Sequence, residues 1–346
     1  MKTFRCLCGN RIFFENTRCL QCGRELGFLP DPLVLVALEP REPDRFATSH
    51  GDYRKCANYV EQGVCNWMVP IPPPTGTSSA AVPSPFCQAC QLNHVIPDLS
   101  IPENRALWGE MEKAKRRLIY SLDQLGLPLR SKAEDPEQGL AFDIKADAGA
   151  TRVLTGHDEG LITLNLAEAD DAEREKMRVA MRERYRTLLG HFRHEVGHYY
   201  WDRLVRDSPQ LSRFRELFGD EREDYGQALQ RHYAKKGPQL DYAESYISPY
   251  AASHPWEDFA ETFAHYLHME DTLETAHHFG IASELPAGAD VTEIRDFALL
   301  MRQWAELTIA LNALNRSMGL PDAYPFAISG RVNAKLQFVH QLVGRG

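Results

Sequence analysis

The residues best suited to chemistry lie in a short motif in the second half of the chain. His194 and His198 enclose Glu195 in an H-E-x-x-H pattern. Residues four apart share one face of a helix, so both imidazoles can direct a nitrogen at one metal ion, with Glu195 beside the metal's water. The pattern predicts a hydrolytic zinc site in which Glu195 acts as the general base.

A third ligand is expected from a second segment, which begins at His254-Pro255 and opens another helix. Glu257 and Glu261 lie one turn apart on it, so Glu257 can bind zinc while Glu261 accepts a hydrogen bond from a ligand imidazole. The alternative is a solvated acidic helix start, favoured by the helix dipole.

All eight cysteines precede residue 91, which indicates a separate module. Short pairs of cysteines place two sulfurs on one tight turn, which forms half of a tetrahedral zinc site. We therefore expect two structural zinc sites, one in each set of four. The first cysteine cluster is Cys6, Cys8, Cys19 and Cys22, and the second cysteine cluster is Cys56, Cys65, Cys87 and Cys90.

Two alternatives to structural zinc remain open for these clusters. Some thiols could be free core residues or a redox pair. Iron held by four thiolates is the chemical competitor, because sequence defines sulfur ligation better than it defines the metal. In a module this small, the metals are expected to supply much of the folding free energy.

The elements that must position these residues follow from periodicity and turn signals. A loop rich in Pro, Ser, Ala and Thr is expected over residues 69–86, and a turn over residues 156–160. The strand at 161–166 is either an edge strand that aligns an extended substrate or an ordinary core strand. Helices are expected over residues 104–125 and 172–205 and from residue 255, and strands over 141–146 and 161–166.

From residue 97 the sequence has no cysteine and shows long amphipathic patterns with brief strands, which predicts two domains. Residues 1–96 form the cysteine-rich zinc-ribbon domain, and residues 97–346 form the helical domain, after a short linker over residues 97–102. The expected fold class is α+β: a small ribbon module of short strands with two four-cysteine sites, then a mainly helical zincin-like domain with a small β-sheet.

Composition limits the partners and the compartment. The formal net charge is −9, and residues 1–96 carry 9 basic against 8 acidic side chains. This balance gives no general attraction to nucleic acid or to anionic membranes, although a local basic patch on the ribbon stays open. No apolar run reaches membrane-spanning length, and no signal-peptide pattern opens the chain, so we expect a cytoplasmic protein.

These motifs resemble those of a known family. The site resembles that of the gluzincin metallopeptidases, and Tyr250-x6-Glu257-Asp258-Phe259-Ala260-Glu261 is similar to the active-site helix of anthrax lethal factor. The whole chain resembles bacterial zinc-binding metallopeptidases that carry an N-terminal zinc ribbon, through HFRHEVGHYYWDRL, FGDEREDY and HPWEDFAETFAHYLHMEDTLETA.

The resemblance implies roles for individual residues. Glu257 would be the third zinc ligand, Glu261 the carboxylate that orients a ligand imidazole, and Tyr250 a phenol that stabilises the transition state. Glu261 stands where the thermolysin-type motif has aspartate, so the lethal-factor pattern should apply. Tyr242 and Tyr246 are the alternatives to Tyr250.

The sequence therefore predicts a zinc metalloendopeptidase with one catalytic and two structural zinc ions. Its substrate would be a peptide or protein, and the ribbon would dock a protein partner. The rival hypothesis is a non-catalytic zinc-binding scaffold whose zincin site is latent or inactive, with the ribbon as its working surface.

Overall fold

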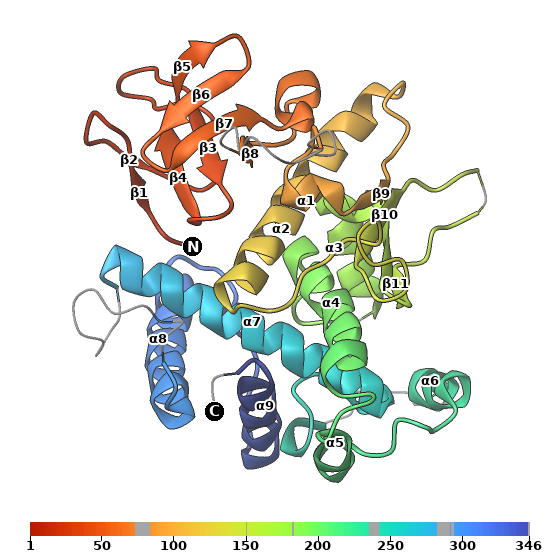
Figure 1. Ribbon diagram of the computed structural model, residues 1–346. Coiled ribbons are helices and arrows are strands. Elements are labelled where there is room, and N and C mark those ends of the chain that lie inside the picture. Colours follow the sequence, from red (N-terminus) through yellow and green to blue (C-terminus); the bar gives the residue numbers. More distant parts are fainter. Residues whose placement is uncertain are drawn as a thin grey trace. The chain divides into compact units, whose positions relative to one another are not determined.

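The structure is a computed structural model that describes residues 1–72, 84–149, 151–181, 183–234, 242–281, 291 and 294–344. The chain folds into two compact units (Figure 1). Unit 1 holds residues 1–124 and 128–176, and unit 2 holds residues 125–127 and 177–346. Among the described residues, no helix combines the length and apolar character needed to cross a membrane.

The first part of unit 1 is built from short antiparallel strands. Strands β1 and β2 form one pair, β3 and β4 a second, and β5 to β8 a four-stranded sheet in sequential order. The bounds are β1 Phe4–Arg5, β2 Arg11–Ile12, β3 Leu26–Leu29, β4 Val34–Ala37, β5 Glu39–Glu42, β6 Arg45–Thr48, β7 Gly51–Lys55 and β8 Met68–Pro70. A π-helix at Asn58–Gln62 and the short helix α1 at Gln88–Gln91 complete this part.

The loop expected over residues 69–86 is only partly described. Val69 and Pro70 belong to β8, because they pair with β7, so the expected loop began too early. Residues 73–83 lie outside the described residues.

The helix expected over residues 104–125 is confirmed as α2, Pro102–Gln124. Its Tyr120 packs against Phe14 of the ribbon, with ring centroids 5.4 Å apart, and Phe14 in turn contacts Phe28 at 4.9 Å. Arg117 adds an ion pair with Glu15 at 2.5 Å. These interactions explain why α2 groups with the N-terminal strands, although a sequence boundary at 96/97 separates them.

Unit 1 also contains a small mixed sheet of four strands in the order β11-β12-β10-β9. Strand β12 pairs antiparallel with β11 and parallel with β10, so it is an interior strand. The bounds are β9 Asn93–Val95, β10 Ala141–Lys145, β11 Gly156–Asp158 and β12 Leu161–Asn165, followed by a 3-10 turn at Leu166–Ala169.

The structure decides one open alternative for this sheet and corrects one expectation. Of the two roles left open for residues 161–166, the core strand is the one found, because both edges of β12 are hydrogen-bonded to neighbouring strands. Residues 156–158, expected as part of a turn, form strand β11, and only Glu159 and Gly160 make the turn. Both residues have positive φ, 45° and 84°.

The helix expected over residues 172–205 is two helices. These are α3, Asp171–Met181, and α4, Leu188–Leu204. Thr187 has extended backbone angles, and its side chain accepts a hydrogen bond from the N–H of Gly190, which begins α4 as a separate helix. Apolar periodicity continued across this cap, so it did not reveal the break.

Unit 2 is almost entirely helical beyond α4. Figure 1 shows the long helix α7 crossing α4 and lying beside α8 and α9, and α7 packs against all three. The bounds are α5 Leu211–Phe218, α6 Tyr225–Ala234, α7 Pro255–Phe279, α8 Phe297–Ser317 and α9 Gly330–Leu342, with 3-10 turns at Tyr242–Glu244 and Tyr250–Ser253.

Local signals define both ends of α7. The His254 side chain caps the N-terminus by accepting from the N–H of Trp256, and Pro255 occupies the first helical position. Gly280 ends the helix in the left-handed conformation, with φ of 68°. The helix start expected at Pro255 is therefore confirmed.

Aromatic side chains form the core around α7. Phe263 stacks on Tyr200 of α4, with ring centroids 5.5 Å apart, and Phe259 contacts Phe214 and Phe218 of α5 at 6.0 and 5.7 Å. Phe259 and Phe263 thus form an apolar face of α7. It fixes the rotation of α7, so that Glu257 and Glu261 face α4.

Candidate metal centres

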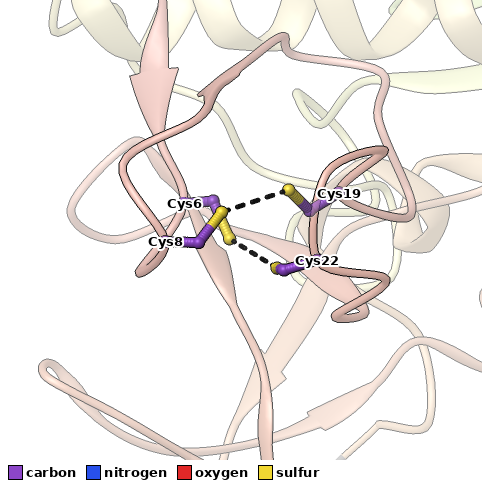
Figure 2. Close-up of side chains that lie close together, drawn as sticks. All are labelled: Cys6, Cys8, Cys19 and Cys22. Carbon is purple, nitrogen blue, oxygen red and sulfur yellow. Dashed lines mark hydrogen bonds between the residues drawn. The ribbon is translucent and has the colours of Figure 1, made fainter.

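The first cysteine cluster brings four sulfurs together, as Figure 2 shows. The Sγ atoms of Cys6 and Cys22 lie 3.6 Å apart, and those of Cys8 and Cys19 lie 3.7 Å apart. A disulfide requires about 2.05 Å. Tetrahedral zinc with bonds of about 2.3 Å separates its sulfurs by about 3.8 Å. The spacing therefore fits tetrahedral zinc and excludes disulfides between these pairs.

Two tight turns present these sulfurs. The N–H of Gly9 bonds to the carbonyl of Cys6, and the N–H of Gly23 bonds to the carbonyl of Cys19, both at 2.8 Å. Both glycines have left-handed φ, 86° and 73°, which side chains with a Cβ rarely adopt. The glycine after each cysteine pair is thus required by the turn.

The second cysteine cluster is more enclosed. All four of its cysteines are buried, whereas Cys22 of the first cysteine cluster is exposed. The Sγ atom of Cys65 lies 3.7 Å from that of Cys87 and 3.8 Å from that of Cys90. These separations again match tetrahedral zinc with four thiolate ligands.

The motif histidines meet on one face of α4. His194 and His198 lie one turn apart, and their Nε2 atoms are 3.2 Å apart. Two ring nitrogens on one helix face that converge this closely can bind the same metal ion. That geometry is the one a shared metal ion requires.

Glu257 completes this group, which we call the His/Glu cluster: His194, His198 and Glu257. Its Oε2 atom lies 3.0 Å from His194 Nε2 and 3.4 Å from His198 Nε2. Zinc bonds of about 2.05 Å set tetrahedral ligand atoms about 3.3 Å apart. The three separations bracket this value, so the residues present fit a zinc ion.

The electrostatics of Glu257 also suit a cation. Glu257 is 1% exposed, and its Oε2 is buried without a hydrogen-bond partner among the described residues. Burial opposes its charge, but the two imidazoles outweigh burial and hold the pKa of this carboxyl well below its usual range. The site therefore keeps a buried anionic oxygen directed at two imidazole nitrogens.

Glu261 contacts the other nitrogen of His194. Its Oε1 lies 2.7 Å from His194 Nδ1, and its Oε2 accepts a 2.6 Å bond from the Ser248 hydroxyl. Burial raises the pKa of Glu261, but His194, and after it His265 and Ser248, outweigh burial and bring the pKa down to about 2. An ionised Glu261 accepts a hydrogen bond from the Nδ1–H of His194 and leaves Nε2 as the metal-binding nitrogen.

His198 is oriented by packing. Its ring lies against the Trp256 indole, with centroids 3.8 Å apart. Trp256 belongs to the first turn of α7, one residue before Glu257. One turn of α7 therefore supplies both a ligand oxygen and the ring that fixes a ligand histidine.

Gly197 allows α4 and α7 to approach closely. A Cβ atom on Gly197 would lie 2.9 Å from the Cα of Ala260, which is closer than real Cβ contacts. Ala260 lies between the two glutamates on α7. The glycine in the H-E-V-G-H motif is thus needed for both helices to reach one ion.

The structure places the remaining predicted residues as follows. Glu195 is buried next to His194 on α4. The Tyr250 ring lies 5.8 Å from the His194 ring, and burial and then Glu257 raise the pKa of its phenol. Tyr246 instead lies against the ammonium of Lys335, 4.4 Å from its ring centroid. Of the two, Tyr250 is the one adjacent to a predicted ligand.

Sequence reasoning missed Tyr225. Its hydroxyl donates a 2.6 Å hydrogen bond to Oε1 of Glu257. Tyr225 is the last residue of the FGDEREDY segment, which contributed to the family resemblance without any assigned role. That segment was the available signal, but its 32-residue distance from Glu257 gave no reason to pair them.

Comparison with known proteins identifies the family. The model of a family described as "Putative zinc-binding metallo-peptidase" matches residues 104–342. The chain belongs to this family. A zinc-ribbon domain model matches residues 3–101, so the N-terminal part is a zinc ribbon with two four-cysteine sites, and the family's zinc-binding description supports zinc as the metal.

The relatives of this chain are close to it in length. Proteins of Mycobacterium bovis and Mycobacterium tuberculosis, all named as uncharacterized proteins, are 43% identical over 349 residues, covering 99% of this chain and 95% of theirs. No solved structure matches the chain. The similarity to anthrax lethal factor therefore stays a prediction from the sequence.

The domain boundary at 96/97 also stays a prediction. The two family matches meet between residues 101 and 104, whereas residues 97–124 and 128–176 fold as part of unit 1. The family matches divide the chain by sequence similarity, whereas the compact units divide it by packing. The two boundaries differ because Tyr120 of α2 packs against Phe14 of the ribbon.

Proposed function

We propose that this protein is a zinc metallopeptidase of the gluzincin type, which hydrolyses internal peptide bonds of a protein or peptide. The observation that carries the proposal is the convergence of three ligand atoms, from His194, His198 and Glu257, within 3.0 to 3.4 Å of one another. Structural zinc sites use four protein ligands, whereas catalytic sites use three and leave one position open. Among the residues that the structure describes, each cysteine cluster brings together four possible ligands, and the His/Glu cluster brings together three.

The burial of this cluster supports a catalytic role over a purely structural one. His194, Glu257 and Glu261 lie where α4 packs against α7, and apolar side chains would pack there with less desolvation cost. The site combines three metal ligands, a carboxylate that orients one of them, and Glu195 beside them. A zinc site that only stabilises the fold needs no residue such as Glu195. The rival proposal, a non-catalytic scaffold, leaves Glu195 and Tyr250 without a role.

The residues of the site have separate tasks in this reaction. Bound zinc supplies a Lewis acid that polarises the peptide carbonyl and lowers the pKa of a water molecule. Glu195 takes the proton from that water and passes it to the leaving nitrogen of the peptide. Glu261 holds His194 through Nδ1, and Tyr250 donates a hydrogen bond to the oxygen on which negative charge develops.

The test is a cleavage screen on the intact, zinc-loaded protein, with casein and a mixed peptide library as substrates. The wild type is expected to cleave, and Glu195→Gln is expected to lose cleavage while keeping its zinc. Glu216→Gln, an exposed glutamate of α5, is the matched control and should cleave normally. Cleavage that survives in Glu195→Gln would remove the proposed general base and with it the mechanism.

A second proposal concerns the ribbon. We propose that the surface around the first cysteine cluster docks an acidic segment of a protein substrate or partner. Leu7 and Leu20 lie within the two cysteine turns and are 65% and 94% exposed. The exposed charged residues of the first 24 are all arginines, namely Arg5, Arg11, Arg18 and Arg24. Exposed leucines and exposed arginines in the same short segments match a peptide that carries both leucine and glutamate side chains.

Binding of a labelled peptide of alternating glutamate and leucine tests this surface. The Leu7→Ser/Leu20→Ser variant should bind it at least about tenfold more weakly than the wild type. Val60→Ser, at an equally exposed valine of the same unit, should bind normally. Tighter binding of single-stranded DNA than of the peptide would instead assign the arginines to nucleic acid.

A further inference from the structure

The two oxygens of the Glu257 carboxylate have different partners. Oε1 accepts a 2.6 Å hydrogen bond from the hydroxyl of Tyr225. Oε2 lies 3.0 Å from His194 Nε2 and 3.4 Å from His198 Nε2, and it has no hydrogen-bond donor among the described residues. One oxygen is thus bound by the protein, and the other is directed at the imidazoles.

The Tyr225 ring is fixed in this orientation from two sides. Its centroid lies 5.3 Å from the His254 ring and 6.1 Å from the Trp256 ring, both in edge-on contacts. These rings belong to the N-terminal end of α7, immediately before Glu257. The phenol is therefore held against the same helical turn as the carboxylate that it contacts.

His254 also ties the start of α6 to the start of α7. Its Nδ1 accepts from the N–H of Trp256 at 3.1 Å, so this nitrogen carries no proton. Its Nε2 must then carry the proton, which it donates to the carbonyl oxygen of Glu223, 3.1 Å away. Because Tyr225 follows two residues after Glu223, this bond restrains the backbone that carries the phenol.

We propose that Tyr225 is a positioning residue that makes Glu257 a one-oxygen metal ligand. The short hydrogen bond holds Oε1 on the phenol and so orients the carboxylate with only Oε2 directed at the imidazole nitrogens. A two-oxygen carboxylate would occupy a second position on the ion. With Oε2 alone bound, the position that water or the peptide carbonyl needs remains open.

This inference rests on the proposed metal site, and it separates the two tyrosines. Tyr250 is assigned to the reacting oxygen, whereas Tyr225 acts through Glu257 and touches no substrate.

The Tyr225→Phe variant tests the proposal, because it removes only the hydroxyl and keeps the ring packed against His254 and Trp256. Tyr225 is 39% exposed, so the fold tolerates the change. Tyr233→Phe is the matched control, on the same helix and 67% exposed. Zinc affinity of the His/Glu cluster is measured by competition with a chelator, with the His194→Ala/His198→Ala double variant as the baseline for the cysteine clusters.

We expect Tyr225→Phe to bind zinc at the His/Glu cluster roughly 10- to 100-fold more weakly, as is typical when a hydrogen bond to a metal ligand is lost. The visible spectrum of the cobalt-substituted protein, after subtraction of the double-variant spectrum, should weaken as Glu257 becomes a two-oxygen ligand and the coordination number rises. Tyr233→Phe should leave both readouts unchanged.

Wild-type zinc affinity and an unchanged cobalt spectrum in Tyr225→Phe would overturn the positioning role. This failure is distinct from failure of the metal site itself. If the metal site itself fails, the double variant will bind as much metal as the wild type. The difference spectrum assigned to the His/Glu cluster will then be absent.

Discussion

His194 Nδ1 lies 2.7 Å from Glu261 Oε1, while the other nitrogen of the same ring lies 3.0 Å from Glu257 Oε2. One imidazole thus joins two glutamates of a single helix, four residues apart. Glu261 contacts the nitrogen that faces away from the cluster, and Glu257 contacts the one that faces into it. The geometry therefore gives the two carboxylates different roles.

This difference predicts an order of effects on zinc binding. Glu257→Ala should nearly abolish zinc binding at the His/Glu cluster, because it removes a ligand. Glu261→Ala should weaken it only roughly 10- to 100-fold, because it removes the bond that orients His194. Zinc titration against a chelator measures both. The reverse order would show that the ligand is one helical turn further along α7.

Tyr250→Phe should affect turnover more than metal binding. Its phenol is proposed to act on the transition state, so kcat should fall roughly 10²- to 10³-fold, the usual effect of losing one such donor. Zinc content and the unfolding midpoint should not change. Steady-state kinetics with a cleaved peptide provide the measurement. A change confined to KM would instead make Tyr250 an ordinary substrate contact.

Gly197 should tolerate no side chain. Gly197→Ala places a Cβ 2.9 Å from the Cα of Ala260, and overpacking of this kind costs roughly 1–3 kcal/mol of unfolding free energy. Gly109→Ala in α2 is the control, since its Cβ would meet Val64 at an ordinary 3.6 Å. That change should be neutral or stabilising by up to about 1 kcal/mol, through helix propensity. Urea unfolding measures the change in unfolding free energy of each variant. Equal changes in the two variants would refute close packing at Gly197.

The two cysteine clusters should release zinc at different rates. Cys22 is exposed and Cys8 is half-buried, whereas every cysteine of the second cysteine cluster is buried. A chelator should therefore take zinc from the first cysteine cluster faster. Release is followed with a colorimetric chelator in Cys22→Ser and Cys90→Ser variants, which identify the phases. Loss of the slow phase in Cys22→Ser would contradict the order.

Much of the metal site could be predicted from the sequence, because its spacing is local. The four-residue spacings of His194 with His198 and of Glu257 with Glu261 each lie within one helix, and helical geometry alone places each pair on one face. The close cysteine pairs with their following glycines are local in the same way. Local spacing could not show that the two pairs meet, but the residue types suggested it.

The features that the sequence did not reveal depend on interactions between distant segments. Tyr225 contacts Glu257 from 32 positions away in the chain, where His254 joins the start of α6 to the start of α7. The interior place of β12 depends on strand pairing on both sides, which its own alternation does not encode. The break before Leu188 depends on the Thr187 cap, which the apolar periodicity does not reveal because it continues across Thr187.

The most direct test of the account is the zinc content of the purified protein, measured by elemental analysis beside the His194→Ala/His198→Ala double variant. If the His/Glu cluster is a metal site, the wild type should hold about three zinc ions per chain and the double variant about two, both in the cysteine clusters. Equal zinc content in the two proteins would contradict the central claim, because His194 and His198 would then hold no metal.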